Sequence, residues 1–196
     1  MNKSITLVLL SLTGCYLKQY PVTEKVARAS TYTVIGQLRD ETEIRSLAWV
    51  ADDHHLVTTG DFCLKSENIV LRIGNETIPV FAHADDNRLC VLDVPENVGM
   101  GPQLVVAREP QRGSRYLTVV GSPIWTRHGV VGVILGVDAE RHATAFVGHA
   151  ELTRFLKRHH VDFVTAPLDS DTYMDPTCQG IPRELGMCSV YALPEW

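Results

Sequence analysis

The chain carries the stretch Val119-Val120-Gly121-Ser122-Pro123-Ile124-Trp125, in which Gly121 and Pro123 mark a tight turn between apolar residues. A second turn, Arg127-His128-Gly129, follows closely, and the β-branched run 130–136 comes after it. Turn residues that separate short runs of apolar and β-branched residues are typical of β-hairpins. The stretch therefore predicts β-structure that is entered through a tight turn.

The rest of the chain repeats this pattern of short apolar runs bounded by Gly, Pro, Asn or Asp. We expect strands at 31–38, 46–51, 56–59, 69–73, 78–82, 89–94, 104–107, 116–120 and 130–137. Residues 151–160 differ, because their apolar side chains fall at helical spacing and basic residues gather near the end of the segment. Many closely spaced strands favour a sandwich or a barrel.

Together these features resemble the trypsin-like serine proteases, most closely their bacterial glutamyl endopeptidase branch. The resemblance covers residues 31–163 and rests on the Gly121-Ser122-Pro123 turn, the hairpin after it, and residues 151–157. That last segment is similar to the closing helix of those enzymes. The resemblance implies an all-β fold, a trypsin-like double β-barrel with a C-terminal helix.

The same resemblance implies that all three catalytic positions are replaced. Val120 stands where the nucleophilic serine is expected, Asp61 at the position of the histidine base, and Arg88 at that of the aspartate. Phe62 takes the base position if the register shifts by one residue. These side chains supply neither a nucleophilic hydroxyl nor an imidazole, so we expect a pseudoprotease rather than an enzyme. Asp61 and Arg88 either form an ion pair in place of the catalytic pair or point into solvent.

Two further positions bear on specificity and activity. Glutamyl endopeptidases read the substrate carboxylate with a histidine, and Ile134 stands at the matching binding position, so glutamate recognition is not expected. Ser122 is an alternative nucleophile, although Pro123 follows it where the family nucleophile is followed by glycine. The alternative function is therefore an active serine hydrolase with Ser122 as a displaced nucleophile.

Four cysteines follow Cys15 in the chain, and they are Cys63, Cys90, Cys178 and Cys188. In an oxidising compartment an even number favours two disulfides, with three possible pairings. The short intervening loop favours Cys178 with Cys188. The resemblance brings Cys63 near Cys90, and two free buried thiols are the alternative there. A zinc site of four thiolates is disfavoured, because no two of these cysteines are separated by only two residues.

The histidine pairs His54-His55 and His159-His160 do not predict a metal site. Adjacent residues of a strand point to opposite faces and do not chelate one ion together. We interpret both pairs as solvated residues of a turn and of a helix end. The sequence analysis therefore predicts no metal and no cofactor.

The N-terminus resembles a bacterial lipoprotein signal. A basic residue precedes the short apolar run 5–12, and Leu12-Thr13-Gly14-Cys15 is similar to the lipobox, whose cysteine is acylated. We expect residues 1–14 to be removed, Cys15 to carry the lipid, and 15–30 to form a tether. Tyr16 after the cysteine favours the outer membrane over inner-membrane retention. An ordinary signal peptide with a chance cysteine, or a buried N-terminal strand, is the alternative.

Composition and charge narrow the function further. The 196 residues carry a net charge of -5 and no basic run, so a nucleic-acid partner is not expected. Residues 164–196 form a polar tail rich in proline. We expect a non-catalytic domain that faces the periplasm from a lipid anchor. It would bind a peptide or protein, or serve as an accessory subunit of an envelope assembly. A purely structural envelope lipoprotein is the remaining alternative.

Overall fold

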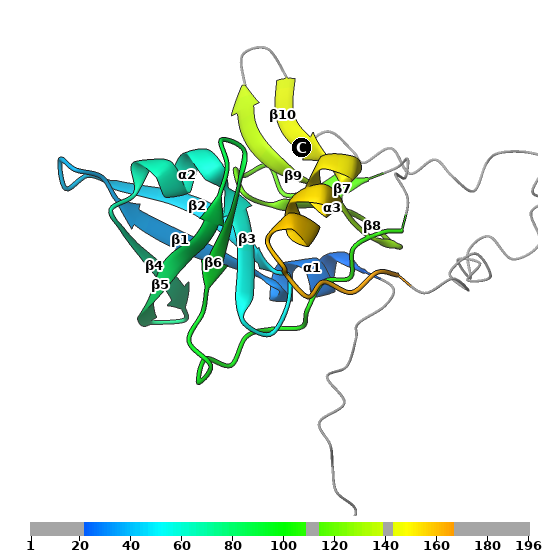
Figure 1. Ribbon diagram of the computed structural model, residues 1–196, viewed down its shortest axis with the longest axis horizontal. Helices are drawn as coiled ribbons and strands as arrows, with labels where there is room; N and C mark the ends of the chain where they lie inside the picture. The colour runs from blue at the N-terminus through cyan, green and yellow to red at the C-terminus, as the bar shows by residue number, and fades with distance from the viewer. Residues whose placement is uncertain (1–21, 109–113, 139–142, 167–196) are drawn as a thin grey trace, which may run out of the picture.

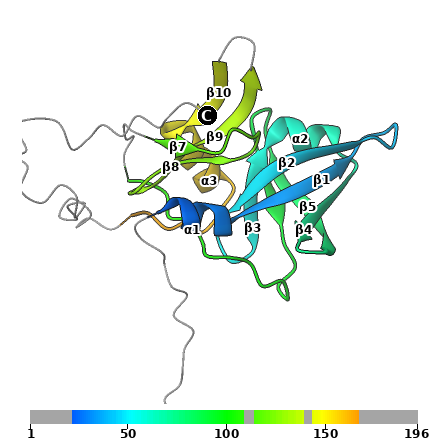
Figure 2. The same ribbon diagram turned by 180° about the vertical axis from the view of Figure 1, so that it is seen from behind.

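Two β-sheets form the framework of the computed structural model, which describes residues 22–108, 114–138 and 143–166. The closed barrel contains, in spatial order, β1 (Thr31–Gln37), β2 (Glu43–Val50), β3 (His55–Thr59), β6 (Leu89–Asp93), β5 (Glu76–Asp85) and β4 (Asn68–Ile73). The second sheet contains β10 (Ala143–Gly148), β9 (Gly129–Asp138), β8 (Pro123–Thr126) and β7 (Arg115–Tyr116). The two sheets lie side by side (Figures 1 and 2).

Strands β3 and β6 are buried on both faces, and this joins the two sheets. Successive strand residues point to opposite faces. In β3, Leu56 packs inside the barrel and Val57 packs in the core shared with the second sheet. In β6, Leu92 packs inside the barrel and Val91 packs in the shared core. Burial on both sides explains why these strands read as continuous apolar runs rather than as an alternating pattern.

Three helices complete the described part of the chain. They are α1 (Glu24–Ala29), α2 (Gly60–Lys65) and α3 (His149–Arg158). The closing helix α3 buries Leu152, Phe155 and Leu156 in the shared core. It begins two residues before the predicted segment. None of the helices in the described ranges has the length and apolar character needed to cross a membrane.

The predicted fold class is confirmed, with differences in the second sheet. Within the described residues this sheet has four strands rather than the six of a second closed barrel. Residues 104–107 do not form a strand, because their N–H groups donate to three separate segments, at Val50, Val164 and Val130. The expected strand 116–120 is mostly turn, and β10 was not predicted.

The boundaries of the folded domain lie outside the predicted ones. Residues 22–30, assigned to the tether, contain α1, and Val22 and Ala27 are buried in the shared core. At the other end Ala166 is buried, inside the predicted tail. Apolar burial therefore makes these short segments part of the domain. The signal segment, Cys15, and the pair Cys178 and Cys188 lie outside the described residues.

A disulfide joins Cys63 of α2 to Cys90 of β6, with the two Cα atoms 6.4 Å apart. This pairing is confirmed. It also rules out the site of four thiolates, because two of the four sulfurs are bonded to each other. The bond fixes α2 across one end of the barrel.

Candidate functional site

The turn formed by residues 119–122 is docked on strand β2 of the barrel. The carbonyl oxygen of Val120 accepts hydrogen bonds from the Leu47 N–H at 2.9 Å and from Ser46 Oγ at 3.2 Å. Gly121 has φ 84°, and a Cβ there would overlap the carbonyl oxygen of Leu47. Only glycine combines a left-handed backbone with so close an approach.

A chain of contacts connects this turn to the other two expected catalytic positions. Thr58 Oγ1 lies 3.0 Å from Ser46 Oγ and donates to the carbonyl of Leu47 at 2.8 Å. Further along, the N–H of Gly60 donates to the carbonyl of Arg88 at 2.9 Å. The structure thus connects the segments that carry residues 61, 88 and 120, although they are far apart in the sequence.

The expected ion pair between Asp61 and Arg88 is not formed. The Asp61 carboxylate lies 2.8 Å from Nζ of Lys65, one helical turn further along α2. The Arg88 guanidinium lies 2.9 Å from the carboxylate of Glu151 at the start of α3. Each charged group is paired with another residue and is largely exposed, so the alternative of exposed side chains is nearer to the observed arrangement. Phe62, the other candidate for the base position, is buried in the barrel.

Ser122 and Ile134 are enclosed in the second sheet. Ser122 is 0 % exposed, and its Oγ donates to the carbonyl of Leu117 at 2.6 Å. No histidine is among the hydrogen-bond partners of this hydroxyl in the described part of the chain. Ile134, which stands at the position matching the specificity histidine, is also fully buried, so its side chain is not open to a ligand. Its backbone pairs instead with the turn, through Gly121 and Ser122.

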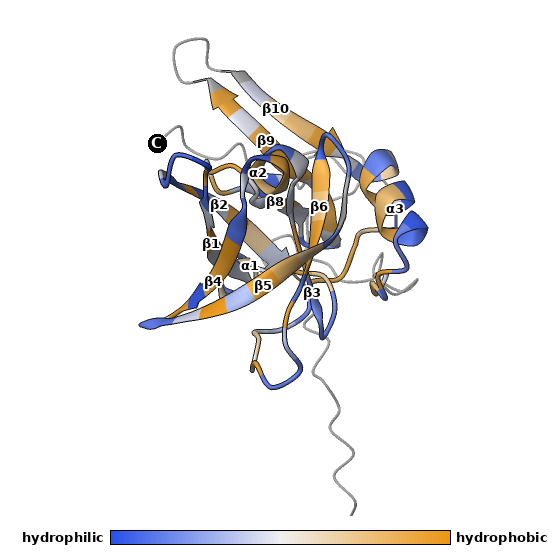
Figure 3. Cartoon of the chain, turned by 60° about the vertical axis from the view of Figure 1, so that its left-hand side comes forward, coloured by the Kyte–Doolittle hydropathy of each residue, from blue (hydrophilic) through white to orange (hydrophobic). Residues whose placement is uncertain are grey.

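Beyond Ile134, strand β9 has a paired neighbour on one side only. The pairing of β8 with β9 stops at Val133, whereas the pairing of β10 continues to Asp138. Residues 135–137 therefore form an edge in the described structure. A Cβ at Gly136 would meet nothing within 4 Å. The hairpin of β9 and β10 projects from the molecule and carries apolar residues along both strands (Figures 1 and 3).

Large apolar side chains are exposed around this edge. Val119 of the docked turn is 47 % exposed and Val137 of β9 is 38 % exposed. Phe146, which is 57 % exposed, lies on β10, on the paired side of β9. An open strand edge offers unpaired N–H and C=O groups, and apolar side chains beside it offer contact area. This combination suits an extended peptide.

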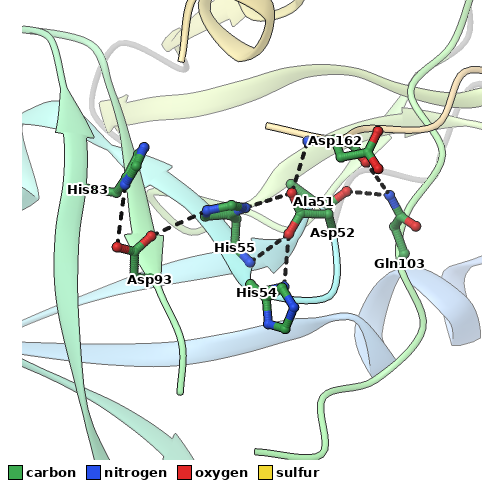
Figure 4. A network of polar contacts seen from close by, with 8 residues as sticks. All are labelled: Ala51, Asp52, His54, His55, His83, Asp93, Gln103 and Asp162. Atoms are coloured by element: carbon green, nitrogen blue, oxygen red, sulfur yellow. Dashed lines mark hydrogen bonds and ion pairs between the residues drawn. The ribbon is translucent and has the colours of Figure 1, made fainter. Parts of the chain in front are cut away.

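A second polar cluster lies on the outer face of the barrel (Figure 4). His55 of β3 stands opposite Asp93 of β6, and its Nε2 is 3.3 Å from Asp93 Oδ1. His83 of β5 approaches from the other side, with Nδ1 3.4 Å from Asp93 Oδ2. The three side chains come from three neighbouring strands of the barrel.

Asp52 contacts the ring nitrogen of His55 that faces away from Asp93. Its Oδ2 lies 2.6 Å from His55 Nδ1 and accepts the N–H of Asp162 at 3.0 Å. Its Oδ1 accepts the N–H groups of His54 and His55, each at 2.8 Å. Gln103 Nε2 donates to the carbonyls of Ala51 and Asp162, so the cluster also ties the segment after α3 to the barrel.

The pKa values of this pair move in opposite directions. The hydrogen bond to Asp52 raises the pKa of His55 above its ordinary value, and this outweighs the burial that lowers it. Burial raises the pKa of Asp52, but the His55 ring and the backbone N–H groups of His54 and Asp162 together hold it below its ordinary value. Each group therefore favours the charged form of the other.

This cluster was not predicted from the sequence. The interpretation of His54-His55 as solvated is correct for the exposed His54 but wrong for His55, which is half-buried and paired. The spacing of Asp52 and His55 across a turn was the available signal, because an Asp side chain commonly caps backbone N–H groups two or three residues on. His83 and Asp93 join only through strand pairing.

Comparison with known proteins finds similarity in structure alone. No protein-family model and no curated protein sequence matches the chain. The active form of the Rv3671c protease from M. tuberculosis matches with a TM-score of 0.58 and 15 % identity, over 76 % of this chain and 91 % of that one. The serine endoprotease from Yersinia pestis matches with a TM-score of 0.56 and 12 % identity, over 73 % and 68 %.

A third similar structure is the HtrA-type protease AlgW with a tripeptide, with a TM-score of 0.55 and 9 % identity over 70 % of this chain and 62 % of that one. At these identities the likeness concerns the fold. The chain has the fold of the trypsin-like serine proteases.

Proposed function

We propose that this chain is a trypsin-like domain without hydrolytic activity that binds an extended peptide segment of a protein partner. The observation that carries this proposal is the one-sided pairing of residues 135–137 in β9, next to the docked turn. A peptide would add as a further strand on this edge and exchange main-chain hydrogen bonds with it. Its apolar side chains would contact Val119 and Val137, which are exposed there.

The arrangement of side chains near the turn supports the absence of catalysis. An acyl-transfer site needs a nucleophile within hydrogen-bond reach of a base, which a third group orients. Here Val120 has no hydroxyl, and the Ser122 hydroxyl is buried against a backbone carbonyl. The charged groups of Asp61 and Arg88 are engaged with Lys65 and Glu151.

A labelling experiment tests the catalytic half of the proposal. The mature chain is incubated with a fluorophosphonate probe and, separately, with casein. We expect neither labelling nor cleavage. Labelling that disappears in Ser122→Ala would show that Ser122 is a nucleophile and would overturn this half.

A peptide-display selection tests the binding half. Peptides selected on the mature chain should lose affinity for Gly136→Leu by about tenfold or more, the effect of about 1.4 kcal/mol. A Cβ at Gly136 meets nothing within 4 Å, so the substitution begins in open space beside the strand edge. Gly99→Leu is the matched control, because a Cβ at Gly99 also meets nothing within 4 Å. Equal binding to both variants would place the site elsewhere, and a selection that enriches no peptide would refute peptide binding.

We further propose that the domain is displayed from the bacterial outer membrane, facing the periplasm, by a lipid on Cys15. The support is the lipobox-like Leu12-Thr13-Gly14-Cys15 after a short apolar run. Labelled palmitate should enter the wild-type chain and not Cys15→Ser. Label that persists in Cys15→Ser would contradict acylation at this residue.

A further inference from the structure

We propose that His55, His83 and Asp93 form a binding site for a divalent transition metal, with Zn²⁺ as the ion that the donor set suits. Two imidazoles and one carboxylate with an open fourth position are a ligand set that zinc takes in proteins. This site lies on the outer face of the barrel and is independent of the proposed peptide edge. The proposal differs from the expectation of no metal, which rested only on the spacing of histidines and cysteines along the sequence.

Two contacts of the cluster are close to the spacing that a metal requires. Tetrahedral ligands at about 2.1 Å from zinc lie about 3.4 Å from one another. In the structure Asp93 Oδ1 lies 3.3 Å from His55 Nε2, and the other oxygen, Oδ2, lies 3.4 Å from His83 Nδ1. One donor atom from each of the three residues lies within 4.8 Å of the other two. Small side-chain rotations are enough to close this arrangement around one ion.

The hydrogen bonds of His55 point its free lone pair at Asp93. The Asp52 carboxylate accepts only, so His55 Nδ1 donates the proton in their 2.6 Å contact. In the neutral ring Nε2 then carries a lone pair, and it faces Asp93 Oδ1, which is also an acceptor. Two acceptors at this distance repel unless a cation lies between them. That cation is either a proton, which makes His55 an imidazolium that donates to Asp93, or a metal ion that uses both lone pairs.

A β-bulge lies at His83. In the pairing of β5 with β6, Ala82 stands opposite Leu92 and Ala84 opposite Val91, so His83 is the additional residue. Bulges re-aim a side chain and are enriched next to functional sites.

Asp52 is a positioning residue, because it orients the His55 ring towards the proposed metal. Metal-bound histidines commonly donate their second ring N–H to a carboxylate, which fixes the tautomer and the ring orientation. Asp52 does this for His55, and three backbone N–H groups hold Asp52 in turn. The ion would therefore join β3, β5 and β6 directly, and the segment at Asp162 through Asp52. Its open position would be taken by water.

Metal titration of the untagged chain tests the proposal. After EDTA treatment and dialysis, the wild-type chain is titrated calorimetrically with Zn²⁺. We expect one ion per chain and, with Co²⁺, the visible absorption of a four-coordinate site. His83→Ala should bind at least about tenfold more weakly and Asp52→Asn about 10- to 100-fold more weakly. The thermal midpoint of the wild-type chain should rise with Zn²⁺ concentration, and that of His83→Ala should not.

His54→Ala is the matched control, because it removes one histidine from the same turn while the His54 ring lies outside the cluster (Figure 4). It should bind like the wild-type chain. His83 is exposed, so circular dichroism of its alanine variant without metal should match the wild type. Equal losses in His83→Ala and His54→Ala, or no binding by the wild type, would show that the cluster is a hydrogen-bonded network only.

Discussion

The substitution Gly121→Ala adds one methyl group where the turn of residues 119–122 meets strand β2. Gly121 has a left-handed backbone with φ 84°. Its added Cβ would overlap the carbonyl oxygen of Leu47 and Ser46 Oγ. Because the nearest of these atoms belongs to a strand inside the closed barrel, it has little freedom to move away. We expect this to be among the most damaging single changes in the chain.

The magnitude is the sum of two effects. A left-handed backbone costs a residue with a side chain about 1–2 kcal/mol. Forcing an extra carbon into a packed site costs about 1–3 kcal/mol more. The free energy of unfolding should therefore fall by about 2–5 kcal/mol, a large part of the 5–15 kcal/mol, roughly, that stabilises a typical domain.

Two other glycines separate these effects. Gly74 has φ 59°, and a Cβ there meets nothing, so Gly74→Ala should show the backbone cost alone. Gly136 lies outside the left-handed region and is equally open. Gly136→Ala should be neutral or stabilising by about 0.4–1 kcal/mol, because alanine restricts the unfolded chain.

Urea unfolding of the three variants, followed by fluorescence and by circular dichroism, measures these differences. We expect the free energy of unfolding to fall clearly more in Gly121→Ala than in Gly74→Ala. If the two lose the same amount, the turn does not press on β2. The close approach of Gly121 to the Leu47 carbonyl would then not be a feature of the protein.

Three further predictions follow from the core and the polar network. Replacing both Cys63 and Cys90 by alanine should lower the free energy of unfolding by about 3–4 kcal/mol, from the loop entropy of their 27-residue separation; urea unfolding that matches the oxidised wild type would contradict this. Leu156→Ala in α3 should cost about 2–5 kcal/mol, and a loss near zero would mean that α3 is not packed as described. With EDTA present, the free energy of unfolding should fall as the pH drops below 3.8, the ordinary pKa of Asp52, because the folded state holds this carboxyl group ionised. It should also fall as the pH rises from 6.5, the ordinary pKa of His55, through the raised pKa of that residue in the folded state. Asp52→Asn should flatten both limbs of that pH profile, and an unchanged profile would refute the pairing.

Much of the fold could be predicted because it is written in local patterns. The runs at β3, β6 and β9 are apolar, the turn at Gly121 is marked by glycine and proline, and α3 has helical spacing. The weak elements were missed for a physical reason. Helix α2 is too short to show a period, and β10 has an exposed apolar side chain at Phe146 instead of an alternating pattern.

The candidate sites also have features that local sequence reveals and contacts that it does not. The absence of a hydroxyl at Val120 could be read from the chain, because residue type alone decides whether a hydroxyl is present. The partner of Asp61 could not, since Lys65 competes with Arg88 for the same carboxylate and only the helix geometry of α2 decides between them. The ion pair of Arg88 with Glu151 could not be predicted either, because it joins residues that are far apart in sequence.

From the sequence alone one can place the turn residues and the apolar runs, and one knows which chemical groups the chain contains. Residue type is enough to show that Val120 cannot attack a carbonyl, whereas the need for glycine at position 121 follows from its left-handed backbone and its contact with β2. The tertiary structure decided which of these groups meet. It brought His55, His83 and Asp93 together from three strands, left residues 135–137 with an open edge, and buried Ser122 and Ile134. Strand register and side-chain direction depend on the packing of distant segments, and no local pattern carries that information.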